Sequence, residues 1–142
     1  MSIDNMMAFK MDLTNFYKVV VPANHTELCK RIAIRLHQAI VAGCPLNPEG
    51  TPVKTGWARA NWAFAVGMPC PTQTIGARPP EGVTINVVQS SAILQTAGPF
   101  PLIWVYNNVP YIEVLENGHS TKAPTGMVAN ALHSTQTFIN TL

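Results

Sequence analysis

The sequence predicts an α+β domain, and three observations support this class. A stripe of apolar residues at helical spacing runs through residues 24–42. Two short segments, residues 62–66 and 102–106, are rich in aromatic and β-branched residues, which is typical of strands. Residues 126–142 again carry apolar residues at helical spacing, so the chain mixes helices and strands without alternating them regularly.

The chain carries few charges. Asp, Glu, Lys and Arg make up 11% of its 142 residues, against about 25% in an average protein. A free monomer covers its surface with charge, whereas the centre of an interface is depleted in charged residues. We therefore expect one domain over residues 1–142 that assembles with other subunits. A net charge of +2 does not provide the clustered basic face that nucleic-acid binding requires.

The N-terminal part is predicted to be an extension followed by a helix. Within the extension, residues 1–23, the segment Met6–Tyr17 has the composition of a short amphipathic helix. Pro22 is expected to end this helix, because proline resists helix continuation. A second helix would then begin at a cap on Asn24 or Thr26.

This second helix has the clearest pattern in the chain. Its apolar stripe consists of residues four positions apart, namely Leu28, Ile32, Leu36 and Ile40. The nearby cations fall largely off the stripe, so we interpret them as a solvated face. Gly43 is expected to end the helix, and Pro45 supports that boundary.

Loops and one strand occupy the middle of the chain. Residues 44–55 contain three prolines and are predicted to be a loop, after which Thr55 is suited to cap a single helical turn. The strand over residues 62–66 follows. Residues 67–82 hold four prolines and are predicted to form a long loop, while residues 83–97 fit either a strand or a helix.

The last third begins with the second strand, residues 102–106. Pro110 suits the first turn of a short helix over Tyr111–Glu116. Gly118 is expected to follow that helix with a positive φ, which most other residues resist. A C-terminal helix is predicted over Gly126–Leu142.

Candidate metal ligands begin with His25 and Cys29, which are four residues apart on the predicted helix. Cys44 and Cys70 would have to complete a tetrahedral site. The chain has no CxxC pair, and free cysteines commonly pack as small apolar residues. We therefore expect no metal and no other cofactor, and three cysteines without a framework spacing predict no disulfide pattern.

Hydrolysis is an alternative, because Glu113 with His119 or His133 could supply a general base. The sequence motifs of serine hydrolases, zinc peptidases and nucleotide-binding loops are absent. We therefore expect no enzymatic activity. The chain also lacks a run of about 20 uncharged apolar residues, so we expect no membrane span, and the acidic N-terminal region does not resemble a signal peptide.

Five aromatic residues fit either the core or an interface. They are Trp57, Trp62, Trp104, Tyr106 and Tyr111. A core position is the ordinary reading for aromatic residues near strands, whereas Trp and Tyr also anchor protein–protein interfaces. The sequence leaves both readings open for each of them.

Two segments of the chain together resemble a known family. The first is PVKTGWARANW, residues 52–62, and the second is NNVPYIEVLENG, residues 107–118, followed by the pattern S-x-K-A-P-x-G-M-V over residues 120–128. They are similar to motifs of the tail-completion, or neck, proteins of tailed bacteriophages, and the likeness covers roughly residues 24–142. Lys54 and His119 depart from it, since the family often has an acid and an aromatic residue there.

The resemblance implies a helix packed on a small, mostly antiparallel sheet, with a short helix after the last strand and a C-terminal helix. It also implies a non-enzymatic virion protein, assembled in the host cytoplasm, that forms a ring, usually hexameric, at the head-proximal end of the tail. Its partners would be other copies of itself, the tail tube protein and the head connector, with DNA only passing through the lumen. A head-side connector or stopper protein is the alternative. Candidate interface residues are Trp57, Arg59, Trp62, Arg78, Pro110, Tyr111, Glu113, Glu116, His119 and Lys122.

Overall fold

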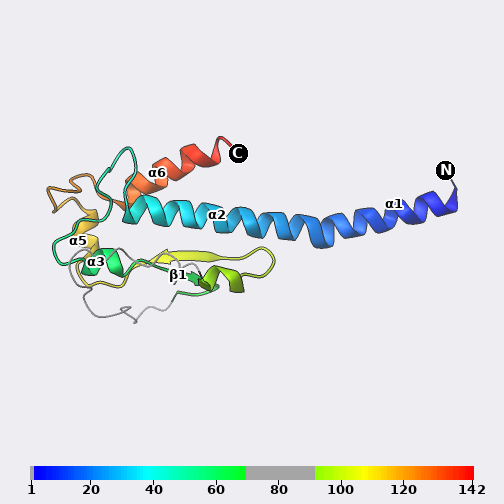
Figure 1. Ribbon diagram of the computed structural model, residues 1–142, viewed down its shortest axis with the longest axis horizontal. Helices are drawn as coiled ribbons and strands as arrows, with labels where there is room; N and C mark the ends of the chain where they lie inside the picture. The colour runs from blue at the N-terminus through cyan, green and yellow to red at the C-terminus, as the bar shows by residue number, and fades with distance from the viewer. Residues whose placement is uncertain (1, 70–91) are drawn as a thin grey trace.

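One continuous helical rod dominates the computed structural model, which describes residues 2–69 and 92–142 (Figure 1). The rod consists of α1 (Ile3–Asn15), the π-helical turn η1 (Phe16–Val20) and α2 (Val21–Val41). Ser2 caps its start, because the Ser2 hydroxyl accepts a hydrogen bond from the Asn5 N–H at 3.3 Å. The prediction of two helices separated at Pro22 is therefore wrong.

The π-helical turn explains why proline does not break the rod. In a regular helix the ring of Pro22 would clash with the carbonyl four residues earlier, and its missing N–H would leave that carbonyl unpaired. Here the Val21 N–H bonds the carbonyl of Phe16, five residues back, so the turn before the proline is wider. Pro22 then occupies the first turn of α2, and neither Asn24 nor Thr26 caps a helix.

The rest of the structure forms a body around the C-terminal half of the rod (Figure 1). After the loop at 44–55 come α3 (Trp57–Ala60), β1 (Ala63–Val66), the 3₁₀ turn η2 (Ile93–Thr96), β2 (Ile103–Tyr106), α5 (Ile112–Glu116) and α6 (Val128–Ile139). The strands β1 and β2 pair antiparallel, with Ala63 opposite Tyr106 and Val66 opposite Ile103. Helix α6 packs along α2, and β2 also contacts α2. The predicted α+β class and its order of elements are confirmed.

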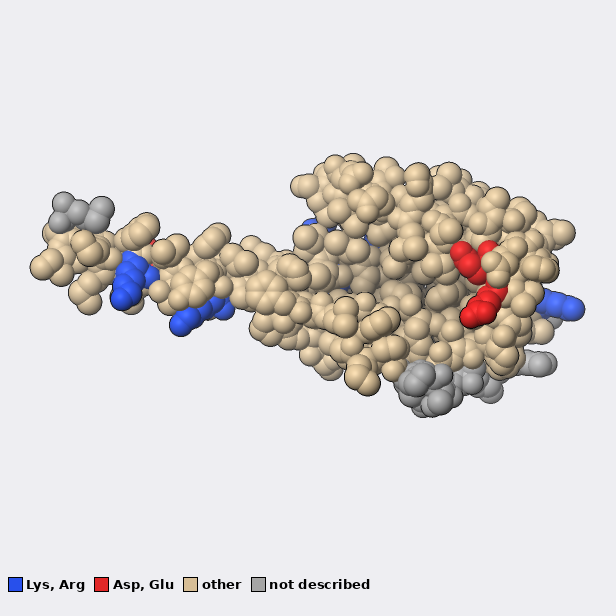
Figure 2. Space-filling model, turned by 180° about the vertical axis from the view of Figure 1, so that it is seen from behind, with Lys and Arg blue, Asp and Glu red and all other residues tan. Residues whose placement is uncertain are grey.

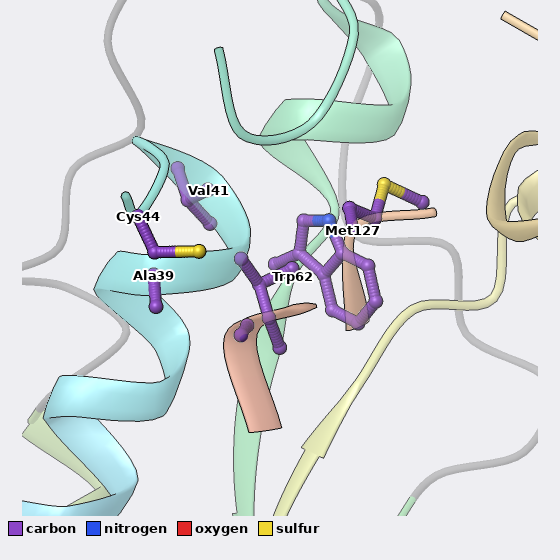
Figure 3. Packing of buried hydrophobic residues seen from close by; sticks show 7 residues of the cluster. Ala39, Val41, Cys44, Trp62 and Met127 are labelled. Carbon is purple, nitrogen blue, oxygen red and sulfur yellow. The ribbon is translucent and has the colours of Figure 1, made fainter. Parts of the chain in front are cut away.

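The core lies where α2, α6 and the start of β1 meet. Trp62 stands between α2 side chains and Met127, the residue before α6 (Figure 3). The cluster as a whole consists of Ala39, Ile40, Val41, Cys44, Trp62, Met127 and Ala131. A second cluster joins Ala33 of α2 to Phe64 and Leu94. These small and large residues interlock because the small side chains let the elements approach the indole ring.

Residues 2–20 leave the body as a helical segment, which we call the arm (Figure 1). None of the residues of α1 or η1 is buried. Burial of the rod begins at Pro22 and Thr26, and the Thr26 hydroxyl donates to the carbonyl of Gly98 at 3.0 Å. The ring of His25 also lies 4.9 Å from that of Phe100, so the loop before β2 holds the rod where the arm emerges.

Two predicted segments lie partly outside the described residues. The predicted loop 67–82 is described only over 67–69, and the candidate interface residue Arg78 lies beyond them. Of residues 83–97, which fitted a strand or a helix, the described end contains the helical turn η2.

Candidate subunit interface

The two segments that carry the family resemblance meet at the end of the body opposite the arm, where α3 and α5 lie (Figure 1). Between them lies a pocket of about 880 Å³, which we call the motif pocket. Its lining comes from one stretch of each segment: Pro52, Val53, Lys54, Thr55, Gly56, Trp57 and Ala58, and Tyr111, Leu115, His119, Ser120, Thr121 and Lys122. Segments about 50 residues apart in the chain therefore build one concave surface.

Two aromatic rings join the walls of the motif pocket. The rings of Trp57 and Tyr111 lie 5.7 Å apart at an interplanar angle of 57°, a tilted arrangement that aromatic pairs favour. Both side chains are half-buried, so each still presents part of its ring to solvent. Gly56 opens α3 with a φ of 77°, which turns the chain so that Trp57 reaches the second segment. Trp57 and Tyr111 are candidate interface residues that the structure brings together.

The first segment is fixed to the body from beneath the pocket. The Trp62 indole N–H donates to the Thr51 hydroxyl at 2.9 Å, and that hydroxyl donates to the Ile40 carbonyl at 2.8 Å. Arg59 donates from Nε to the Thr51 carbonyl at 3.1 Å and from its terminal nitrogen to the Glu49 carbonyl at 2.7 Å. Trp62 is therefore a core residue rather than a surface for a partner, and Arg59 holds the proline-containing loop in place.

A single asparagine anchors the second segment to the first. Asn107 donates from its side-chain amide to the Ala58 carbonyl at 2.7 Å, and its carbonyl oxygen accepts from the Val109 N–H at 3.0 Å. Val109 is almost completely buried, while Pro110 beside it is exposed. The turn that the sequence predicted at this point therefore also forms a tertiary contact, because its hydrogen bond joins the end of β2 to α3.

The side chain of Glu116, the last residue of α5, caps the start of α6 on the far side of the loop that joins the two helices. Its carboxylate accepts hydrogen bonds from the N–H groups of Met127, Val128 and Ala129, at 2.9, 2.8 and 3.0 Å. These are three of the N–H groups that a helix start leaves unpaired, and a negative charge there also favours the helix dipole. Glu116 was a candidate interface residue, but its carboxylate is engaged inside the chain.

Two glycines allow this cap to form. Gly118 has a φ of 80°, which confirms the predicted positive φ, and a side chain there would collide with the carbonyl oxygen of Pro124. Gly126 has a φ of 83°, and a Cβ atom would lie 2.6 Å from the Glu116 carbonyl oxygen. Both positions therefore require glycine for conformation and for space.

The remaining candidates are exposed. His119 and Lys122 line the motif pocket, and Glu113 lies on the exposed side of α5. The His119 Nδ1 atom lies 3.2 Å from the Val114 carbonyl oxygen. Among the residues that the structure describes, Glu113 forms no hydrogen bond or ion pair with His119 or His133. The pairing on which the hydrolase alternative depends is thus not formed in this arrangement.

The candidate metal ligands come together only in part. The Sγ atom of Cys29 lies 3.6 Å from Nδ1 of His25, as the spacing predicted. Cys44 is buried in the core, and Cys70 lies outside the described residues. Over residues 2–69 and 92–142, no three His, Cys, Asp or Glu side chains are grouped so that they could hold a metal ion.

Sequence reasoning missed His37, the one histidine that is completely buried among the described residues. Its Nε2 atom lies 3.2 Å from the Trp62 carbonyl, which fits a donated hydrogen bond, and its ring stacks at 4.7 Å on Phe64. Burial lowers the pKa of His37, because the charged imidazolium would lose its hydration, and the bond to Trp62 offsets part of that effect. The sequence did contain a signal for it, because His37 lies four residues after Ala33 and three before Ile40, on the face of α2 that is buried.

Because of this shift, the protein is expected to lose stability as the pH falls. The unfolded chain binds a proton at His37 below about pH 6.5, whereas the folded chain with its lowered pKa does not. The unfolded state then binds more protons, so the free energy of unfolding decreases from about pH 6.5 downwards. Thermal unfolding of the wild type and of His37→Gln at pH 7 and pH 5 measures this. Equal decreases of Tm in the two proteins would contradict it.

Two further findings concern the chain as a whole. In the parts that the structure describes, no helix is both long and apolar enough to cross a membrane. Comparison with protein-family models, curated proteins and solved structures found no significant match to the chain.

Proposed function

We propose that this chain is a structural subunit of a bacteriophage neck, which forms a ring at the head-proximal end of the tail. One observation carries this proposal. The two segments that resemble tail-completion proteins, although distant in the sequence, line the same motif pocket and are held there by internal hydrogen bonds. Such a shared location is expected if both segments serve one contact between subunits.

The chemistry of the pocket favours binding over catalysis. Among the described residues, about half of its lining is apolar or aromatic, and the charged side chains that line it are Lys54 and Lys122, with no carboxylate. In the second segment, the carboxylate of Glu116 is occupied by three backbone N–H groups. An apolar centre with a polar rim is the usual composition of a protein–protein interface.

The low charge of the surface supports assembly in the same way. Figure 2 shows that most of the displayed face carries neither Lys or Arg nor Asp or Glu. The proposed partners are further copies of the chain in a ring, expected to be hexameric, the tail tube protein on one side and the head connector on the other. DNA would pass through the lumen, and the protein would reside in the virion after assembly in the host cytoplasm. A head-side connector or stopper is the second candidate, since the same pocket and arm would serve there.

Removal of the gene from the phage that encodes it tests the proposed function. We expect filled heads without joined tails, and tail tubes that lack a defined head-proximal end in electron micrographs. Wild-type protein supplied from a plasmid should restore joined virions. Normal virions in the absence of the chain would contradict the proposal, and finished tails of normal length without heads would favour the connector alternative.

A further inference from the structure

The arm has a surface that a soluble monomer does not explain. Nine large apolar side chains on it are exposed by 50 to 77%: Ile3, Met6, Met7, Phe9, Met11, Leu13, Phe16, Tyr17 and Val19. At about 200 Å² for a fully exposed large side chain, they present roughly 1,000 Å² of mostly apolar surface. A stable protein–protein interface needs about 800 Å² from each partner. The arm thus carries enough surface for one complete side of an interface.

Four of these side chains follow the pattern of a helix that binds in a groove. Met6, Phe9, Leu13 and Phe16 are separated by three, four and three residues, so they form one stripe along the helix. Helices that dock into apolar grooves use anchors at this spacing. Residues 3–20 extend roughly 27 Å at the helical rise of about 1.5 Å per residue. The arm is therefore able to reach well beyond its own body.

The motif pocket, like the arm, presents apolar side chains. The helices α3 and α5, which contribute to its lining, lie at the end of the molecule opposite the arm (Figure 1). Val53, Trp57, Tyr111 and Leu115 supply apolar surface, and a volume of about 880 Å³ leaves room for several side chains. The charged residues of its rim are Lys54 and Lys122. The arm as a whole is neutral, since it carries Asp4, Lys10, Asp12 and Lys18. Asp4 lies in the first turn of α1, so the charge nearest the tip is acidic and complements that rim.

We infer that the arm of one copy docks along the body of a second copy, with its apolar side chains at Met6 and Phe9 in the motif pocket. Arm and pocket lie at opposite ends, so the contact is head-to-tail, and each copy in a chain of such contacts uses both surfaces. Contacts of this type close into a ring when the rotation between copies permits, which is the geometry that the proposed function requires. The inference rests on the proposed function only for the closure into a ring.

Two variants of the 142-residue chain test the arm and the motif pocket separately. The arm variant, Met6→Glu with Phe9→Glu, places charges at two exposed positions of the apolar stripe. The pocket variant, Lys54→Glu with Lys122→Glu, reverses the charge of the exposed rim. Gln136→Glu with Thr137→Glu is the control, because it adds charge at two exposed positions of α6 outside both surfaces. Circular dichroism and Tm establish that each protein is folded.

Sedimentation velocity at about 50 µM then gives the decisive measurement. We expect the wild type and the control to assemble and each variant alone to remain at least tenfold more dissociated. An equimolar mixture of the two variants should form dimers and nothing larger, because the intact arm of one fits the intact pocket of the other and no second pair remains.

Four results would overturn the inference: a monomeric wild type, a pocket variant that assembles normally, a mixture that stays monomeric, or dissociation of the control to the same degree. The second would mean that arms contact some other surface, such as each other. If one of these results is found, gene deletion still tests the proposed function independently, because a ring can assemble through other faces of the subunit. Conversely, arm-to-pocket dimers in a chain whose deletion yields normal virions would refute the function alone.

Discussion

Replacement of Glu116 by glutamine is expected to lower the free energy of unfolding by about 2–3 kcal/mol, although the side chain keeps its size. The carboxylate accepts hydrogen bonds from the N–H groups of Met127, Val128 and Ala129 at the start of α6. An amide offers one oxygen in place of two and turns its own N–H₂ group towards a backbone donor. A hydrogen bond to a charged group contributes about 1.5–3 kcal/mol. The bonds to Met127 and Val128 are partly buried, so they account for most of the expected loss, whereas the bond to Ala129 is exposed.

Glu113→Gln is the matched control for this experiment. Glu113 lies three residues earlier on α5 and is exposed, and its carboxylate has no hydrogen bond or ion pair in the described part of the chain. The same chemical change there is expected to alter stability by less than about 0.5 kcal/mol. Thermal unfolding measures both, and the Glu116 variant should unfold roughly 5–10 °C lower than the wild type. Equal Tm values for the two variants would show that the cap contributes nothing.

The outline of the fold could be predicted because its signals are local. Of the stripe predicted in α2, namely Leu28, Ile32, Leu36 and Ile40, only Ile40 is buried. The helix itself, its end just before Gly43 and the composition of both strands nevertheless each depend on a few neighbouring residues. The positive φ of Gly118 was predictable for the same reason, since it follows a short helix. These elements depend on spacing and backbone freedom, which a single sequence displays directly.

The start of the rod could not be predicted because the rule for proline assumes a regular helix. Pro22 normally ends a helix, but a π-helical turn before it removes the conflict. That turn has no sequence signature of its own. Its consequence is large, since it converts a separate short helix into an arm that is continuous with α2 and points away from the body (Figure 1).

The parts of the site that sequence reasoning missed are those in which distant residues meet. Glu116 lies 12 residues before Val128, the first residue of α6, so no capping motif with local spacing contains it. The resemblance identified both segments of the motif pocket, but only the fold shows that they face each other. The sequence also could not distinguish core from interface positions for the tryptophans, because that distinction depends on how far the fold buries each side chain.

The tryptophans also provide the second prediction with a large effect. Trp62→Ala is expected to lower the free energy of unfolding by about 3–5 kcal/mol, which is a large part of the total stability of a small domain. Trp62 is 5% exposed, fills the space between α2 and α6, and donates to the buried Thr51 hydroxyl (Figure 3). Its removal leaves a cavity and disturbs the hydroxyl that fixes the loop beneath the motif pocket.

Trp57→Ala serves as the comparison, because this half-buried tryptophan lines the pocket and contacts Tyr111 rather than the core cluster. We expect it to cost about 1 kcal/mol of stability and to weaken assembly at least tenfold, since tryptophans in interface pockets carry much of the binding energy. Denaturant unfolding and sedimentation velocity on both variants separate the two effects. A Trp57 variant that unfolds as readily as Trp62→Ala would mean that the pocket wall belongs to the core, and the motif pocket could then not act as an independent docking surface.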